Sequence, residues 1–164
     1  SIGSASILVG LALILVALAL GERPGLGTLL NMLLIGIFMD LIIGLGLIPV
    51  VQGWPAGIAV LVLGLFIISL ASFFYIGSGF GAGPRDALMV ALTRVTRLPI
   101  GLIRGLIELS ATLVGWLLGG LAGLGTVIAG LAIGLCIQLS FRVLRFRPTQ
   151  VVHTGLGELY RSLR

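Results

Sequence analysis

Five apolar stretches, each about as long as a lipid bilayer is thick, account for most of the sequence. They are separated by short turns rich in glycine and proline, and they cover Ile2–Leu20, Thr28–Pro49, Gly57–Ile76, Ile100–Leu118 and Thr126–Phe141. An α-helix of about 20 apolar residues crosses the hydrocarbon core of a membrane. Only 9% of the 164 residues are charged, whereas a soluble domain carries roughly 25%. The sequence therefore predicts an all-α fold, a polytopic membrane helix bundle with five spans.

The longest interruption of the apolar pattern lies between the third and fourth spans, from Gly77 to Gly101. Pro84 suits the first position of a helix. Asp86 would fall in the first turn of that helix and Arg94 in its last, where their charges match the helix dipole. A helix over residues 84–97 would be about 20 Å long, which is too short to cross a core of about 30 Å. We expect a short amphipathic helix that lies at the membrane surface or between the spans.

The turn before this helix forms a second candidate feature. Gly81 and Gly83 directly precede Pro84 and Asp86. Backbone N–H groups of a glycine-rich turn at a helix N-terminus can bind an anion. A single glycine-rich turn also occurs simply as a link between helices. Both interpretations stay open for these four residues.

An internal repeat is visible at an offset of 98 residues. The block Gly25–Thr28 reads GLGT, and the same four letters recur at Gly123–Thr126. The pair Ile2-Gly3 recurs at Ile100-Gly101. Leucine matches carry little weight in so apolar a chain, but a repeated block with a matching pair upstream indicates an internal duplication.

The repeat predicts how the chain is divided. The expected parts are an incomplete first repeat with two spans (1–56), a second repeat with three spans and the short helix (57–145), and a basic tail (146–164). Units of three spans must lie in opposite orientations in the membrane, as in many secondary transporters. The first repeat lacks a counterpart of the third span and its glycine-rich turn, so we expect a matching span before Ser1. The alternative is that the protein lost one span, since terminal elements vary among repeat proteins.

The arginines predict the orientation of the bundle. The chain has a net charge of +5 and no lysine, and one side of the five spans holds Arg23, Arg85, Arg94, Arg97, Arg142, Arg145, Arg147, Arg161 and Arg164. Basic residues are enriched in cytoplasmic segments. We therefore predict a multi-pass protein of the cytoplasmic membrane whose C-terminus faces the cytoplasm. Because these arginines lie at the ends of apolar segments, nucleic acid is not an expected partner.

Three motifs together resemble a known family. These are the GxGPxD pattern of Gly81–Asp86, the LPIG of Leu98–Gly101 and the RPGLGT of Arg23–Thr28. They are similar to motifs of the bacterial YczE-like family of integral membrane proteins, which is loosely related to the YitT group. The resemblance covers roughly residues 1–145 and implies a helical membrane fold without implying an activity. In that family a first span and a GPWD-like element usually precede the SIG that here is Ser1-Ile2-Gly3.

Five polar residues inside the spans are candidates for an intramembrane site: Asp40, Arg104, Glu108, Gln138 and Asn31. A charge at the bilayer centre costs about 2.5–3.5 kcal/mol on insertion scales, so such residues face protein or water. Arg104 and Glu108 are spaced i,i+4 and share a helix face. They form either a self-neutralising structural pair or part of a substrate or ion site. We expect Asp40 to lie near the fourth span, within reach of Arg104 or of a water-filled cavity.

The remaining features exclude some functions and leave two open. One cysteine gives neither a disulfide nor a metal motif, and we expect no cofactor and no metal. No nucleophile, base and acid set is recognisable, so an enzyme is not expected. Pairs such as Gly101/Gly105 permit close helix contacts within the chain, in a homo-oligomer or in a larger membrane complex. The chain is thus either a permease-like protein that moves a small solute or ion, or an accessory subunit of such a complex.

Overall fold

The computed structural model describes residues 1–48 and 51–151, and the elements in this part of the chain are helical. In chain order they are α1 (Ile2–Ala19), α2 (Leu26–Gly44), α3 (Trp54–Gly77), α4 (Pro84–Thr96), α5 (Ile100–Leu117), α6 (Leu124–Val143) and the short 3₁₀ helix η1 (Pro148–Gln150). Every α-helix except α4 is long and apolar enough to cross a membrane, which makes five candidate spans in the described part. The predicted bundle of five spans with one short additional helix is confirmed. Arg161 and Arg164 of the predicted tail lie outside the described residues.

The repeated sequence makes the same turn twice. Gly25 precedes α2 with φ −93° and Gly123 precedes α6 with φ −92°, both in an extended backbone. Upstream of them, Gly21 has φ 84° and Gly119 has φ 91°. Residues other than glycine rarely adopt such positive φ values. Two helical hairpins, α1–α2 and α5–α6, therefore turn with closely similar backbone geometry.

Glycines let the two helices of each hairpin approach closely. A Cβ atom placed on Gly36 would lie only 2.9 Å from the carbonyl oxygen of Gly3, and one placed on Gly101 would lie 2.5 Å from the carbonyl oxygen of Gly134. Small residues at a crossing permit such contacts between membrane helices. In both hairpins the crossing lies near the start of the first helix, at positions that are 98 residues apart in the sequence.

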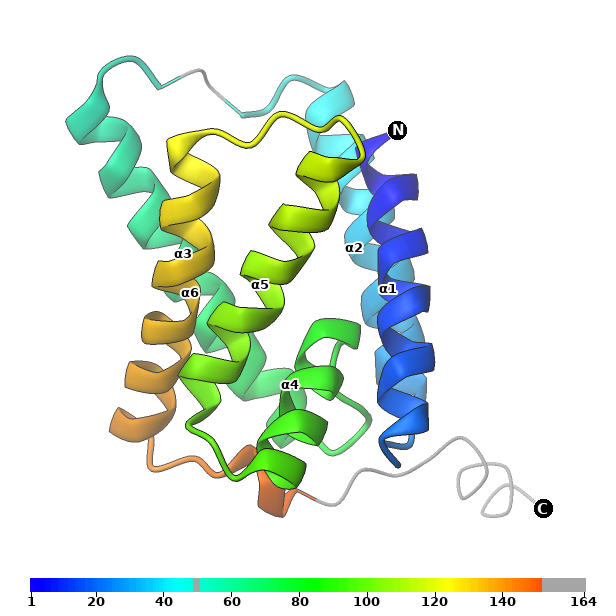
Figure 1. The fold of residues 1–164 in the computed structure, drawn as a ribbon. Coiled ribbons are helices and arrows are strands. Elements are labelled where there is room, and N and C mark those ends of the chain that lie inside the picture. The colour runs from blue at the N-terminus through cyan, green and yellow to red at the C-terminus, as the bar shows by residue number, and fades with distance from the viewer. Residues whose placement is uncertain (49–50, 152–164) are drawn as a thin grey trace.

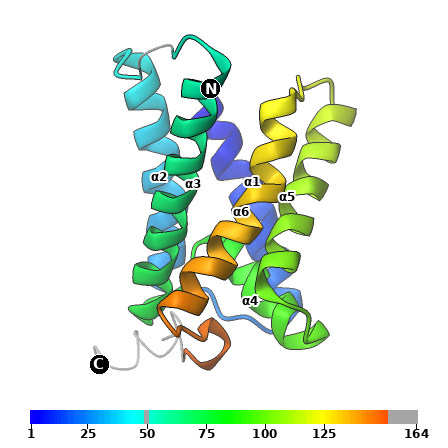
Figure 2. The ribbon, with the colours of Figure 1, turned by 90° about the vertical axis from the view of Figure 1, so that its left-hand side faces the viewer.

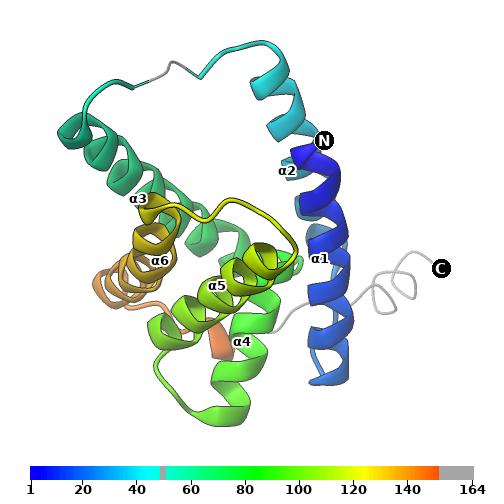
Figure 3. The same cartoon turned by 45° about the horizontal axis from the view of Figure 1, so that its top comes forward.

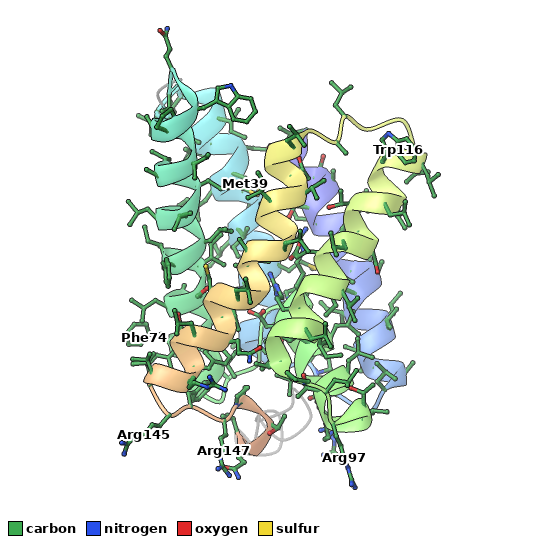
Figure 4. The ribbon with its side chains drawn as sticks, turned by 60° about the vertical axis from the view of Figure 1, so that its left-hand side comes forward. Met39, Phe74, Arg97, Trp116, Arg145 and Arg147 are labelled. Atoms are coloured by element: carbon green, nitrogen blue, oxygen red, sulfur yellow. The ribbon has the colours of Figure 1, made fainter. Side chains whose placement is uncertain are left out.

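The two hairpins run in opposite directions. Figure 1 shows that α1 begins at the end of the molecule at which α5 ends. The turn after α1 and the turn before α5 lie at one end, together with α4 and η1 (Figure 2). Arg97, Arg145 and Arg147 also lie at this end, which we name the arginine end, whereas Trp116 lies at the opposite end (Figure 4).

Helix α4 joins the α1–α2 hairpin to the rest of the bundle. It packs against α1, α2 and α5, while α3 packs against α6. Seen from above, α1 and α2 stand on one side and α3, α5 and α6 on the other (Figure 3). Most of α4 is buried, with Met89 and Ala91 completely covered. Of the two positions that the sequence allowed for this helix, it therefore occupies the one between the spans.

Most apolar side chains of the spans point outward. Leu118 is 83% exposed and Leu135 is 71% exposed, whereas the buried core is gathered around α4, where Ile76 and Ile137 are fully covered. Apolar surface on this scale is not found on a soluble monomer. It fits a bundle that is surrounded by lipid.

Candidate functional site

A buried ion-pair cluster joins α4 to α5. Arg104 on α5 is 5% exposed. One of its terminal nitrogens, Nη1, contacts Oδ1 of Asp86 on α4. The other, Nη2, lies 2.9 Å from Oε1 of Glu108, one helical turn further along α5. Arg104 and Glu108 thus form the ion pair that their i,i+4 spacing predicts, and Asp86 adds a second acid.

A hydroxyl from α3 completes the surroundings of Asp86. The Ser72 hydroxyl donates a hydrogen bond of 3.0 Å to Oδ2 of Asp86, and it lies 2.9 Å from the Tyr75 hydroxyl. Asp86 is 2% exposed. Burial raises the pKa of this carboxyl, while the Arg104 charge and the Ser72 hydrogen bond act in the opposite direction. Burial thus disfavours the charged form of Asp86, and Arg104 and Ser72 favour it.

One donor of the cluster is left free. The Nε–H group of Arg104 is buried and has no hydrogen-bond partner among the described residues. Arg85, whose side chain is 45% exposed, approaches Glu108 only to 3.7 Å. A buried donor without a partner costs about 1–3 kcal/mol. An acceptor atom of a solute or of a water molecule would remove this cost.

The cluster lies against a cavity of about 740 Å³ between the two groups of helices. Asp86, Arg104 and Glu108 line it together with apolar side chains such as Ile35 and Leu65. Because α4 lies at the arginine end (Figures 1 and 2), the charged groups carried by α4 face the cavity from that end. An apolar pocket with a few convergent polar groups has the usual character of a ligand site.

Asp40 lies elsewhere. Its Oδ1 atom accepts a 2.8 Å hydrogen bond from the Gly3 amide, and its Oδ2 atom accepts a 2.6 Å bond from the Ser1 hydroxyl. Asp40 thus faces the first turn of α1 instead of lipid, but the expected proximity to Arg104 does not occur, because Arg104 pairs with Asp86 and Glu108. A carboxylate at a helix N-terminus interacts favourably with the helix dipole, so these contacts stabilise the start of α1.

Gln138 occupies the corresponding place in the second hairpin. A Cβ atom on Gly101 would lie 2.5 Å from Oε1 of Gln138, just as one on Gly3 would lie 2.6 Å from the carboxyl carbon of Asp40. The two polar groups that the repeat aligns therefore lie at equivalent helix starts. Neither of them is among the residues that line the cavity.

The glycine-rich turn before α4 packs against α2. A Cβ atom on Gly81 would lie 2.6 Å from Oγ1 of Thr28, and one on Gly83 would lie 2.6 Å from Oδ1 of Asn31. Gly83, Pro84 and Asn31 also line the cavity. The close contacts explain why glycine is needed here, and the candidate anion site at Gly81–Asp86 stays a prediction.

Sequence reasoning did not find the contact between Asp86 and Arg104. The sequence relates Asp86 only to the dipole of its own helix, and no pattern in it points to Ser72 or Tyr75 as neighbours of this acid. The sequence feature that could have indicated this contact is the three-residue link between α4 and α5, Arg97–Pro99. So short a link keeps consecutive helices in contact. It brings Asp86 on α4 next to Arg104 in the first half of α5.

These features define an integral membrane protein with a helical bundle and a buried charged cluster. The chain belongs to a family of unknown function (DUF6198), which it matches over residues 1–142. It is 36% identical over 147 residues to an uncharacterized protein of Haemophilus influenzae, covering 90% of this chain and 66% of that protein. It is 35% identical over 142 residues to the uncharacterized membrane protein YczE of Bacillus subtilis, covering 85% of this chain and 65% of the relative.

The expected membership of a YczE-like membrane family is confirmed by these relatives. The chain spans about two thirds of the length of the curated relatives that it matches. No solved structure matches it.

Proposed function

We propose that the protein is a permease-like membrane protein, without enzymatic activity, in which the α1–α2 and α5–α6 hairpins are parts of two inverted repeats. Their similar turns, their equivalent glycine crossings and their opposite directions support the inverted relation. In transporters built from inverted repeats, the working site lies between the repeats near the middle of the membrane. The cavity of about 740 Å³ is lined by residues of both hairpins, which supports a site between them.

The observation that carries the proposal is the Asp86–Arg104–Glu108 cluster at the wall of that cavity. Ionisable groups inside a membrane protein are costly, and they commonly mark solute or ion pathways and proton relays. In this mechanism Asp86 takes up and releases a proton, and the free Nε–H of Arg104 binds an acceptor atom of a small solute. Protonation neutralises Asp86 and weakens its ion pair with Arg104. Proton binding at Asp86 is thereby linked to the binding of a solute at Arg104.

Proton movement in lipid vesicles tests the proposal directly. The protein is reconstituted into vesicles that contain a pH-sensitive dye, and a potassium diffusion potential is imposed with valinomycin. We expect a change of internal pH that depends on the protein and that is lost in Asp86→Asn, because the amide cannot carry a proton.

Asp40→Asn is the matched control for this assay, because Asp40 is also an acid in the bundle but does not line the cavity. It should move protons like the unchanged protein. Equal proton movement in Asp86→Asn and in the unchanged protein would exclude Asp86 as a proton carrier.

The alternative function is an accessory subunit that packs against a larger membrane complex. It is favoured by Gly44, Gly57, Gly64 and Gly115, at which a Cβ atom would meet no described atom within 4 Å. Such positions on the outer faces of α2, α3 and α5 admit a helix of another chain closely. Purification separates the two functions, because a subunit should co-purify with other chains in fixed proportion, whereas a permease should be stable alone or as a homo-oligomer.

A further inference from the structure

The GLGT block at Gly25–Thr28, here named the first seat, binds the segment that leads into α4. The Gly27 amide donates a 2.9 Å hydrogen bond to the carbonyl oxygen of Phe80. A Cβ atom on Gly27 would lie 3.0 Å from that oxygen. Thr28 is covered by the same segment and is 1% exposed. The glycines and the threonine of this block thus bind a polypeptide backbone at close range.

The second GLGT block, Gly123–Thr126, has the same backbone but is uncovered. A Cβ atom on Gly123 or on Gly125 would meet no heavy atom within 4 Å among the described residues. Thr126 is exposed, in contrast to Thr28. Thr126, Ala129 and Gly130 continue from this block along α6 and line the cavity.

The shape of the two seats is similar further along each hairpin. In the first, Met32 of α2 fills the space in front of Gly10 of α1, since a Cβ atom on Gly10 would lie 2.8 Å from the Met32 side chain. In the second hairpin the glycine lies on the other helix. The Cβ atom of Glu108 on α5 lies 3.6 Å from a Cβ atom placed on Gly130 of α6. Each pair is made of one glycine and one long side chain.

We propose that Gly123, Gly125, Thr126, Ala129 and Gly130 form a docking surface, here named the bare seat, for a polypeptide segment with the chemistry of Phe80–Thr96. Such a segment has a glycine-rich turn, a proline and a short amphipathic helix. The bound helix would lie in the cavity opposite α4, with the charged cluster between the two helices. This inference rests on the observed equivalence of the two hairpins, and it does not depend on transport.

Two observations favour a polypeptide segment over other occupants. The Gly125 amide, which corresponds to the Gly27 amide, forms no hydrogen bond within residues 1–48 and 51–151. A backbone carbonyl can accept this bond, as Phe80 does in the first seat, whereas the hydrocarbon chain of a lipid has no acceptor atom. A second copy of this chain is a poorer occupant, because its own Phe80–Pro84 segment is already held by its first GLGT block.

Cysteine labelling tests the bare seat with a matched control. Thr126→Cys and Thr28→Cys are made in a chain in which the buried Cys136 is replaced by serine, and the rate of reaction with a maleimide is measured in detergent micelles. We expect Cys at position 126 to react fast and Cys at position 28 to react slowly. A synthetic peptide with the sequence of residues 79–97 should then slow the reaction at position 126 to the rate at position 28, and a scrambled peptide should not.

A second peptide tests the chemistry of the occupant. The peptide with Gly81→Leu and Gly83→Leu should not protect position 126, because these glycines make the closest approach in the first seat. The inference is overturned if position 126 reacts slowly without any peptide, if its protection depends only on protein concentration, which indicates a second copy, or if lipid vesicles protect it and the peptide does not. The transport assay plays no part in these outcomes, so failure here leaves the proposed function untouched.

Discussion

Arg104 lies between two acids inside the bundle, Asp86 on α4 and Glu108 on α5. Its two acidic neighbours differ in their surroundings, since Asp86 is 2% exposed whereas the Glu108 side chain is 18% exposed. Removing one partner of a buried ion pair leaves an uncompensated charge. The consequences of substitution at positions 86 and 104 should therefore be unequal.

Asp86→Leu should lower the free energy of unfolding by about 3 kcal/mol, at the low end of the range for breaking a buried pair, because Glu108 still faces Arg104. Arg104→Met should cost less, because Asp86 can become neutral by taking up a proton. Thermal unfolding in detergent micelles measures both effects. Glu22→Gln is a suitable control, since its ion pair with Arg94 (2.9 Å) joins a Glu22 side chain that is 12% exposed to an arginine side chain that is 48% exposed, so water reaches the pair and it should contribute less than the buried one. An equal loss in Asp86→Leu and Glu22→Gln would contradict the role of the buried pair.

The Arg104→Met variant should also be destabilised as the pH rises. Burial raises the pKa of Asp86 above 3.8, and the Arg104 charge that opposes this increase is absent in the variant. A carboxyl with a raised pKa in the folded state stabilises the fold below its unfolded pKa, and this contribution is lost as the pH rises through the folded pKa. The melting temperature of Arg104→Met, relative to that of Asp86→Leu/Arg104→Met, should therefore be higher at about pH 4 than at about pH 8. A difference that does not change with pH would show that Asp86 does not titrate in the fold.

At the residue scale, the sequence identifies charges but not all of their partners. Arg104 and Glu108 stand out because they interrupt an apolar stretch, and their spacing on one helix predicts their ion pair. Asp86 lies in a polar segment, where an acid needs no special explanation, and only the packing of α4 against α5 shows its partner. Asp40 illustrates the opposite case, because its polarity is satisfied by the start of the neighbouring helix.

At the scale of helices, the close crossing of α1 and α2 depends on glycine. A Cβ atom on Gly36 would lie 2.6 Å from the Ile7 side chain, whereas one on Gly64 in the middle of α3 would meet no described atom within 4 Å. Overpacking of a tight contact costs about 1–3 kcal/mol. Gly36→Ala should therefore lower the melting temperature, and Gly64→Ala should leave it unchanged or raise it, because alanine is the better helix former. Equal effects of the two substitutions would contradict the crossing.

The same reasoning explains what could be predicted about the helices. Their bounds follow from the glycine and proline turns, and the predicted spans agree with the structure to within three residues, except that α2 ends at Gly44, whereas the predicted end at Pro49 lies outside the described residues. The position of α4 could not be chosen from its amphipathic pattern alone, because a membrane surface and a protein interior both accept an apolar helix face. The burial of Met89 and Ala91 between the spans depends on how all the other helices pack.

At the scale of the whole molecule, the offset of 98 residues predicts that two hairpins are alike, and the structure places their equivalent glycines in equivalent contacts. It does not predict that α4 joins the α1–α2 hairpin to the rest of the bundle. That arrangement comes from contacts between distant segments, such as the Gly27–Phe80 hydrogen bond, which no local pattern encodes.

The orientation of the molecule in the membrane is a further prediction at this scale. Arg97, Arg145 and Arg147 lie at the arginine end (Figure 4), and arginine-rich segments are retained in the cytoplasm. Leu121, between α5 and α6 at the other end, is fully exposed, and Gln150 in η1 is exposed at the arginine end. In intact cells, a membrane-impermeant maleimide should label Leu121→Cys and should label Gln150→Cys only after the cells are opened. Because both variants carry Cys136→Ser, the parent Cys136→Ser chain gives the background. Labelling of Gln150→Cys alone in intact cells would reverse the orientation, and labelling of both variants there would contradict the placement of the α5–α6 turn and η1 on opposite sides of the membrane.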